Sequence, residues 1–292
     1  MSEQQICQCG GTAFFNNTLR TFNFYDCSFC SLRFVHPRYL DEAIYDNDYF
    51  DGASHGFGFS NYEEDKTASS SYLGFLLRRV HKLVSGQSNT LLDIGAANGF
   101  FVSLASTSGF KSKGIELSED AVNWALRLGR DVRKTSIEEF KAEESFDIVT
   151  ILDVLEHLAE PRKTLQMISQ FLNHKGILVI NVPDRSSIFA RICGYRWHAY
   201  LPPEHWFYFN RKSISELLEQ TGFQVVEMGN LSKSFTVSYI LKTISNSPQF
   251  PKPVRFVADI AIKLLRGWTH KIKIKVPLYD NLYIIATLKE KL

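Results

Sequence analysis

The sequence predicts an α/β fold: a doubly wound, mostly parallel seven-stranded sheet whose last strand runs antiparallel. One observation is that apolar runs of strand length alternate with segments of helical periodicity. Another is that the run from Leu91 to Ile94 stops at a small-residue turn bounded by Gly95 and Gly99, and an apolar, helix-compatible segment follows. Such alternation implies a sheet covered by helices on both faces.

The remaining elements follow in chain order. A helix at 71–84 leads into the first strand. The strands expected after the turn cover 113–117, 131–135, 147–152 and 177–182, and the helices cover 119–129, 161–174 and 212–221. Ser118 is a favourable helix N-cap, and Gly176 is a favourable end for the helix that begins near Pro161.

The C-terminal part is expected to add two strands, at 222–228 and 279–287, on either side of a helical insertion at about 232–276. The domain organisation that we predict is a main domain at 71–292, a small Cys-rich N-terminal module at 1–36 and a connecting segment at 37–70. The connecting segment is polar, with scattered tyrosines and glycines, so it either packs on the main domain or forms a lid over a ligand.

Length and composition are those of a globular protein. The chain has 292 residues, 45% of them hydrophobic and 22% charged, and a formal net charge of +2. This charge implies no polyanionic partner, so no nucleic acid is expected. The N-terminus shows no signal segment, and no apolar run is long enough to span a bilayer. We therefore expect a cytoplasmic, reducing location, where cysteines are thiols or metal ligands.

Four of the five cysteines lie within the first thirty residues, in two pairs: Cys7 and Cys9, then Cys27 and Cys30. Two Cys pairs separated by strand-like sequence are typical of a zinc ribbon, in which four thiolates hold a structural zinc. The second pair has the usual Cys-x-x-Cys spacing, whereas the first is one residue short. The alternative is a small module whose thiols bind no metal.

An acidic residue follows the glycine turn at a distance that matters for ligand binding. Glu116 lies 23 residues after Asp93, at the end of the second strand, where doubly wound folds place a carboxylate that binds ribose hydroxyls. A dinucleotide fingerprint requires glycine at its first, third and sixth positions, which here are Gly95, Ala97 and Phe100. Only the first of these is glycine, so the turn does not match a dinucleotide site. No Lys-Ser/Thr pair follows the turn either, which excludes a Walker loop. The ligand expected is a nucleoside without a pyrophosphate.

Several motifs together resemble the class I S-adenosylmethionine-dependent methyltransferases. Leu92-Asp-Ile-Gly-Ala-Ala-Asn-Gly-Phe-Phe is similar to their first motif, with Ala97 in place of the middle glycine. Segments resembling the later motifs of the ubiquinone-methyltransferase-like branch follow in order: Gly114-Ile-Glu-Leu-Ser, Ser145-Phe-Asp-Ile-Val-Thr-Ile-Leu-Asp-Val-Leu-Glu-His-Leu, Lys175-Gly-Ile-Leu-Val-Ile-Asn-Val-Pro and Pro203-Glu-His-Trp-Phe-Tyr-Phe. The Cys-rich N-terminus also resembles that of methyltransferases linked to sugar and surface-polysaccharide pathways.

The resemblance implies S-adenosylmethionine (SAM) as the cofactor, and it implies a role for each matching residue. Asp93 would order the turn and face the ammonium group, and Glu116 would bind the ribose. The methionine and ribose portions of the cofactor would be lined by Gly95, Ala96, Ala97, Asn98 and Gly99. Adenine would contact Ser136 and Ile137, and the methionine side would be closed by Asp153 and Val154. Core packing is the alternative for Ile137 and Val154.

The expected reaction is methyl transfer to a small-molecule acceptor, for which a sugar or nucleotide-linked sugar is the favoured class. A hydroxyl acceptor benefits from a general base, and His157 and His205 are the candidates because both follow strands at the carboxyl edge of the sheet. His157 could instead hold its loop in place, and His205 could serve packing. The alternatives in function are a SAM-binding module without catalysis, or a methyltransferase for a lipid or quinone-type acceptor at a membrane surface.

A late helix is relevant to the membrane alternative. Its apolar face consists of Val254, Val257, Ala261, Leu264, Leu265 and Trp268. Nine Lys or Arg against three Asp or Glu occur from Pro251 onward. This helix could lie on an anionic membrane, but a cap over the substrate cleft is the favoured interpretation. No oligomeric state follows from the sequence.

Overall fold

The chain divides into two units. The computed structural model describes residues 4–19, 21–36, 62–84, 89–141, 144–231, 234–246, 251–264, 272–275 and 278–289. The first unit comprises residues 1–40, 79–231 and 279–292, and the second comprises 41–78 and 232–278. The connecting segment predicted at 37–70 lies mostly outside the described residues, as do Leu265 and Trp268 of the late helix.

A seven-stranded sheet with the order β11-β14-β9-β8-β5-β6-β7 forms the centre of the first unit. Its strands are β5 (Thr90–Ile94), β6 (Lys111–Glu116), β7 (Val132–Lys134), β8 (Phe146–Leu152), β9 (Leu172–Pro183), β11 (Phe223–Leu231) and β14 (Asn281–Leu288). β14 runs antiparallel to both of its neighbours, and the other pairs are parallel. The predicted fold class is confirmed.

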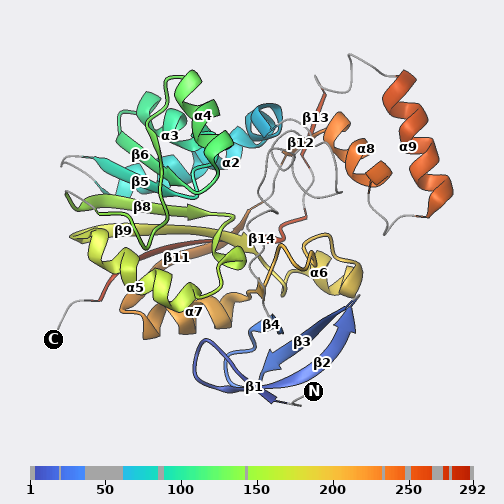
Figure 1. Cartoon of the computed structure of the whole chain (residues 1–292), viewed down its shortest axis with the longest axis horizontal. Helices are drawn as coiled ribbons and strands as arrows, with labels where there is room; N and C mark the ends of the chain where they lie inside the picture. Colours follow the sequence, from blue (N-terminus) through green and yellow to red (C-terminus); the bar gives the residue numbers. More distant parts are fainter. Residues whose placement is uncertain are drawn as a thin grey trace. The chain divides into compact units, whose positions relative to one another are not determined.

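Helices cover both faces of this sheet, as Figure 1 shows. α3 (Phe100–Thr107) and α4 (Glu119–Arg127) lie on one face, and α5 (Pro161–Phe171) and α7 (Arg211–Gln220) lie on the other. Ser118 caps α4 as predicted, because its Oγ accepts a hydrogen bond from the Ala121 amide at 3.3 Å. Most residues of β5, β8, β9 and β14 are buried, and the core lies between these strands and the helices.

The predicted end of the helix that begins near Pro161 is wrong. Helix α5 ends at Phe171, and Gly176 lies inside β9. Leu172 pairs with Phe146 of β8, so strand pairing begins well before the glycine. A Cβ on Gly176 would lie 2.8 Å from Leu172 Cδ2, so this glycine allows a close approach within the strand.

The Cys-rich segment forms a second sheet, with the order β1-β2-β3-β4-β10. Its strands are β1 (Gln4–Ile6), β2 (Thr12–Leu19), β3 (Phe22–Cys27), β4 (Arg33–His36) and β10 (Phe207–Tyr208). β10 comes from a distant part of the chain and pairs with β4. Buried aromatic side chains join the two parts, including Phe24, Trp197, Tyr200 and Tyr208. The N-terminal sheet is thus completed by a strand from the region that follows β9.

The second unit contains the insertion. Helices α8 (Val237–Asn246) and α9 (Lys252–Leu264) pack together, and Arg255 Nε donates a hydrogen bond to Ser245 O at 2.8 Å. β12 (Ser234–Thr236) and β13 (Lys273–Lys275) form an antiparallel ribbon that the sequence did not predict. The long helix α2 (Tyr62–Leu83) belongs partly to each unit. It begins nine residues before the predicted start at 71, so the end of the predicted connecting segment is helical. None of the helices in the described ranges has the length and hydrophobicity that crossing a bilayer requires.

Candidate active site

The turn between β5 and α3 contains three left-handed backbone positions: Gly95 (φ 71°), Ala97 (φ 48°) and Gly99 (φ 71°). Glycine adopts this backbone conformation without steric cost, whereas a residue with a Cβ adopts it only at a cost. Ala97 occupies the position where the first methyltransferase motif usually has glycine. Its positive φ explains why glycine is preferred there. A Cβ built on Gly95 would lie 2.5 Å from Val154 Cγ2, so the chain after β8 contacts the turn directly.

Glu116 connects this turn to the end of β6. Its Oε2 accepts a hydrogen bond from the Ala97 amide at 2.8 Å, and its Oε1 accepts from the amides of Leu117 at 2.8 Å and Ser118 at 2.9 Å. An ionised carboxylate has about four acceptor positions, so capacity for a ligand hydroxyl remains. Leu117 follows it and is 62% exposed, so an apolar side chain that was not predicted for the site lies beside this carboxylate.

Two polar pairs, one buried and one partly buried, hold the carboxyl ends of β5 and β8. Thr150 Oγ1 donates a hydrogen bond to Asp93 Oδ1 at 2.5 Å. Asn181 Nδ2 donates to Asp153 Oδ1 at 2.6 Å, and the Asp153 amide donates to Asn181 O at 2.9 Å. Asp153 also adopts a positive φ of 57°. Thr150 and Asn181 were not predicted as site residues, although a polar residue inside an otherwise apolar strand is a usable signal.

The other predicted cofactor residues lie around this turn with defined contacts. Asn98 is fully buried, its Oδ1 accepts a hydrogen bond from the Phe100 amide, and its carbonyl accepts one from Arg130. Ser136 Oγ accepts from the Glu139 amide at 3.1 Å, at the start of the loop after β7. Ile137 is a member of the buried core, in agreement with the packing alternative. Its contact with adenine stays a prediction.

His157 and His205 lie side by side, with ring centroids 4.7 Å apart and an interplanar angle of 81°. His157 Nδ1 lies 2.9 Å from Glu204 O, and His205 Nδ1 lies 2.8 Å from Ala199 O. A carbonyl oxygen only accepts, so we assign the proton to Nδ1 in both rings, which leaves the lone pair on Nε2. Burial lowers the pKa of His205 well below its usual value, and the neighbouring His157 lowers it further.

These two histidines also form a group of metal-type donors with Glu156. One ligand atom from each of the three side chains lies within 4.8 Å of the others. Two imidazoles and a carboxylate are a donor set found around divalent transition metals. The structure therefore brings the two predicted bases together, and their catalytic role stays a prediction.

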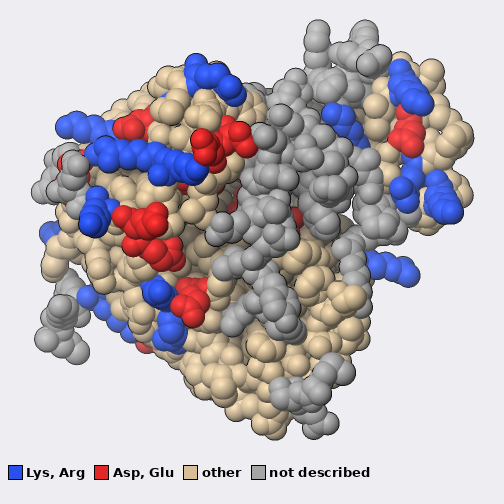
Figure 2. Space-filling view, viewed as in Figure 1, with Lys and Arg blue, Asp and Glu red and all other residues tan. Residues whose placement is uncertain are grey.

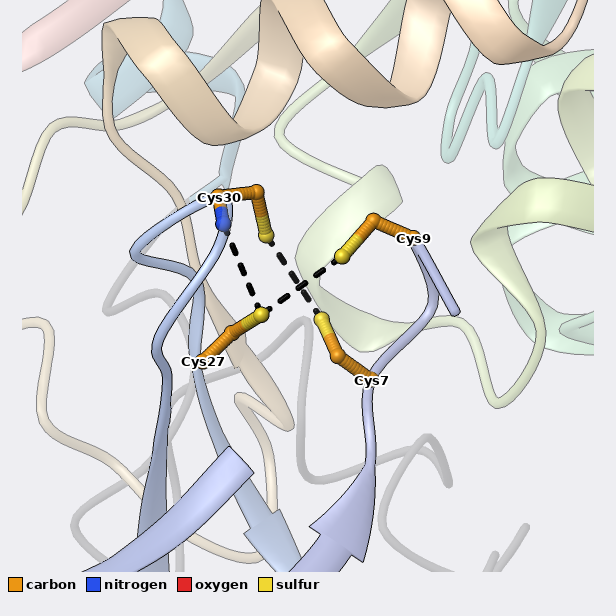
Figure 3. A group of neighbouring side chains, drawn as sticks. All are labelled: Cys7, Cys9, Cys27 and Cys30. Atoms are coloured by element: carbon orange, nitrogen blue, oxygen red, sulfur yellow. Dashed lines mark hydrogen bonds between the residues drawn. The ribbon is translucent and has the colours of Figure 1, made fainter. Parts of the chain in front are cut away.

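The four clustered cysteines point their sulfur atoms toward one another (Figure 3). Cys7 Sγ lies 3.6 Å from Cys30 Sγ, Cys9 Sγ lies 3.5 Å from Cys27 Sγ, and all four sulfurs lie within 4.8 Å of one another. A tetrahedron of ~2.3 Å zinc–sulfur bonds has sulfur–sulfur edges of about 3.8 Å. The cluster therefore has nearly the dimensions of a four-thiolate zinc site.

Both Cys turns present an amide to a sulfur despite the short first spacing. The Gly11 amide donates to Cys9 Sγ at 3.4 Å, and the Cys30 amide donates to Cys27 Sγ at 3.5 Å. A Cβ on Gly11 would lie 3.1 Å from Cys27 Sγ, so only glycine fits comfortably beside the sulfurs. A hydrogen bond from Cys7 lowers the pKa of Cys30 to about 5. This donor set fits zinc, and the N-terminal module is zinc-ribbon-like.

Residues 69–228 match a family described as a methyltransferase domain, which is more than half of the chain. The chain belongs to this family. Its fold and cofactor-side motifs are those of the class I SAM-dependent methyltransferases, as the sequence predicted.

Curated relatives agree with this assignment over part of their length. A ubiquinone biosynthesis O-methyltransferase of Marinobacter nauticus is 27% identical over 173 residues, which cover 53% of this chain and 72% of the relative. The enzyme with the same name from Nitrosospira multiformis is 30% identical over 131 residues, covering 41% of this chain and 53% of the relative. The chain thus spans about half the length of the second relative.

Solved structures show the same fold. A SAM-dependent methyltransferase from Archaeoglobus fulgidus has a TM-score of 0.50 at 22% identity, and the match covers 75% of this chain and 94% of that one. The plantazolicin methyltransferase BpumL, solved in complex with SAH, has a TM-score of 0.53 at 16% identity, covering 79% and 88%. These likenesses establish the architecture of the methyltransferase domain.

Proposed function

We propose that this chain transfers the methyl group of SAM to a small-molecule acceptor. The observation that carries the proposal is the turn of Gly95 to Gly99, joined to Glu116 through the Ala97 amide and packed against Val154. This arrangement brings together a backbone that a ligand can approach closely and a carboxylate at the distance that suits a ribose. It contains none of the lysine or glycine signatures of a phosphate site.

Each side chain has a defined task in this proposal. Bound SAM supplies a methyl group already activated by its sulfonium charge. Gly95, Ala96, Ala97, Asn98 and Gly99 would line its methionine and ribose portions, while Ser136 would meet adenine. Alignment of the acceptor with the methyl group would then supply much of the rate enhancement, because positioning lowers the entropic barrier.

Two acidic residues would complete the cofactor site. Asp93, held by Thr150, would face the ammonium group of the cofactor. Asp153, held by Asn181, would close the methionine side together with Val154. Both carboxylates are fixed by buried partners before any ligand binds, so little reorganisation is needed on binding.

A sugar or nucleotide-linked sugar is the acceptor class that we favour, because of the Cys-rich N-terminus. A quinone-type phenol is the second candidate, and the names of the curated relatives support it. On the face shown in Figure 2, basic and acidic side chains are interspersed. Such a surface, with a net charge of +2, does not favour a nucleic acid.

The cysteine cluster belongs to the same proposal as a structural zinc site. The described cysteines form no disulfide. A reducing, cytoplasmic location, in which such thiols are available to a metal, is part of this proposal. Four thiolates would leave no open position on the metal, so the site would stabilise the N-terminal sheet rather than take part in the reaction. The division into 1–36, 37–70 and 71–292 stays a prediction.

A tracer assay tests the proposed reaction. The purified chain is incubated with SAM labelled in the methyl group, together with three acceptor sources: nucleotide sugars, catechols, and a low-molecular-weight extract of cells that lack the chain. We expect labelled product from at least one source, and its identity separates the sugar from the quinone class. SAM binding with no labelled product from any source would contradict catalysis and support a binding module.

A further inference from the structure

We propose that His198, held by Asp280, is the general base that removes the proton from the acceptor hydroxyl. This inference rests on the proposed function, with oxygen as the methylated atom. His198 Nε2 lies 3.5 Å from Asp280 Oδ2. Their side chains are 51% and 5% exposed, so a buried carboxylate faces an imidazole that a ligand can reach.

The carboxylate of Asp280 is fixed by its surroundings. The indole Nε1 of Trp197 donates a hydrogen bond to the same Oδ2 at 2.9 Å, and Trp197 itself is fully buried. The Asp184 amide donates to Asp280 O at 2.7 Å, which joins the loop after β9 to the start of β14. A distance of 3.5 Å is longer than a good hydrogen bond, and catalytic pairs commonly tighten only when substrate binds.

Strand order places this pair at the same edge of the sheet as the predicted cofactor residues. Asn281, directly after Asp280, is paired with Pro183 at the carboxyl end of β9. β9 is also the neighbour of β8, whose end carries Asp153. Two strand spacings separate the ends of β8 and β14, roughly 10 Å. The pair therefore lies at the edge of the sheet where an acceptor would meet the methionine side of the cofactor.

The two histidines predicted as bases are less suited to meet an acceptor. His205 is only 8% exposed, and its burial disfavours the protonated form that a base must reach. His157 has a side-chain exposure of 12% and binds the backbone of the loop that contains His205. His157 also has a carboxylate neighbour, Glu156 at 4.0 Å, but only His198 combines such an anion with a ring that is 51% exposed. The anion stabilises the imidazolium that forms when the ring accepts a proton.

The proposed step moves one methyl group and one proton. A lone pair of the acceptor oxygen forms a bond to the methyl carbon, and the bond between that carbon and the sulfonium sulfur breaks. The sulfur keeps the electron pair and becomes a neutral thioether. The hydroxyl proton goes to His198, whose positive charge faces Asp280, and later passes to water.

The test compares His198→Gln with His174→Gln, a matched control. His174 is exposed and lies near the amino end of β9, at the opposite edge of the sheet. The substrate is the acceptor source that receives label from the wild-type chain in the tracer assay. We expect His198→Gln to lower kcat by about 10²-fold, to leave the Kd for SAM within about twofold, and to remove the acidic limb of the pH profile.

Asp280→Asn tests the positioning role, because asparagine still accepts a hydrogen bond from Trp197 but lacks the charge. We expect a smaller loss of kcat, and an NMR titration of the His198 ring that moves to lower pH. Unchanged kcat in His198→Gln with an active wild type would overturn the assignment of the base alone. A wild-type chain that binds SAM and labels no acceptor would overturn the proposed function as well.

Discussion

Val154 packs against Gly95 so closely that a Cβ on the glycine would lie 2.5 Å from Val154 Cγ2. Gly95 follows β5 and Val154 follows β8, so this contact joins the loops after two neighbouring strands at the edge where the cofactor is expected. The sequence predicted both residues as cofactor contacts. It did not predict that Val154 would leave no room for a side chain at position 95.

Gly95→Ala is therefore expected to destabilise the chain and weaken SAM binding. The new Cβ meets both an unfavourable φ of 71° and Val154, and we expect a loss of about 2–4 kcal/mol in the free energy of unfolding. Gly129→Ala is the matched control, because Gly129 has a φ of 68° and nothing within 4 Å of its Cβ position. Equal losses in urea denaturation of the two variants would show that the contact with Val154 is unimportant.

Glu116→Gln is expected to weaken both the turn and the ligand site. The substitution replaces one carboxylate oxygen by an amide NH₂ group, which cannot accept a hydrogen bond. At least one of the backbone amides that now donate to Glu116 would then face another donor. We expect the Kd for SAM to rise at least tenfold, about 1.4 kcal/mol, and unfolding free energy to fall by about 1–3 kcal/mol. Glu119→Gln, at an exposed ion pair with Lys134, is the control and should change neither quantity appreciably.

Zinc content tests the cysteine cluster. We expect about one zinc per chain by elemental analysis, and a lower melting temperature after removal by a chelator, because a structural metal stabilises only the folded form. Cys27→Ser should reduce the zinc content, whereas Cys193→Ser should not, because Cys193 lies in α6 (Ile188–Cys193), outside the cluster. A wild-type chain without zinc, or equal loss in both variants, would contradict the assignment.

Stability should decrease in mild acid because of His205. Its pKa is lowered in the folded chain, so below the unfolded value of about 6.5 the unfolded chain binds more protons. The contribution of His205 to the free energy of unfolding is therefore fully present above that pH. It falls as the pH drops toward the folded pKa, by up to about 1.4 kcal/mol per pH unit. His205→Gln should reduce this slope in urea denaturation between about pH 6.5 and 5. His174→Gln should keep it, and identical slopes in all three proteins would refute the role of His205.

Local sequence pattern predicted β5 and β8 because nearly all of their residues are buried. Leu91, Leu92 and Ile94 of β5 are all buried, and such runs are readable without tertiary information. The start of β9 was mispredicted because Leu172 continues a helical pattern locally and pairs with Phe146 only in the folded sheet. β10 was missed for a similar reason: its two residues pair with β4, far away in the sequence.

In the candidate site too, local pattern predicted single residues, whereas their contacts depend on the folded structure. Glu116 was predicted from its distance to the glycine turn, but its bonds to three backbone amides require the folded loop. The pair of His198 and Asp280 had no sequence signal at all, since the two residues are brought together only when β14 inserts beside β9. Contacts between strand ends are a property of topology, which spacing alone does not encode.

Calorimetric titration of the full chain with SAM, and in parallel with NAD⁺, tests the central claim most directly. The turn at 95–99 and the carboxylate of Glu116 predict binding of one SAM per chain, with no heat from NAD⁺ and with affinity reduced at least tenfold in Glu116→Gln. Binding of NAD⁺ but not SAM, or SAM affinity that is the same in Glu116→Gln, would contradict the account.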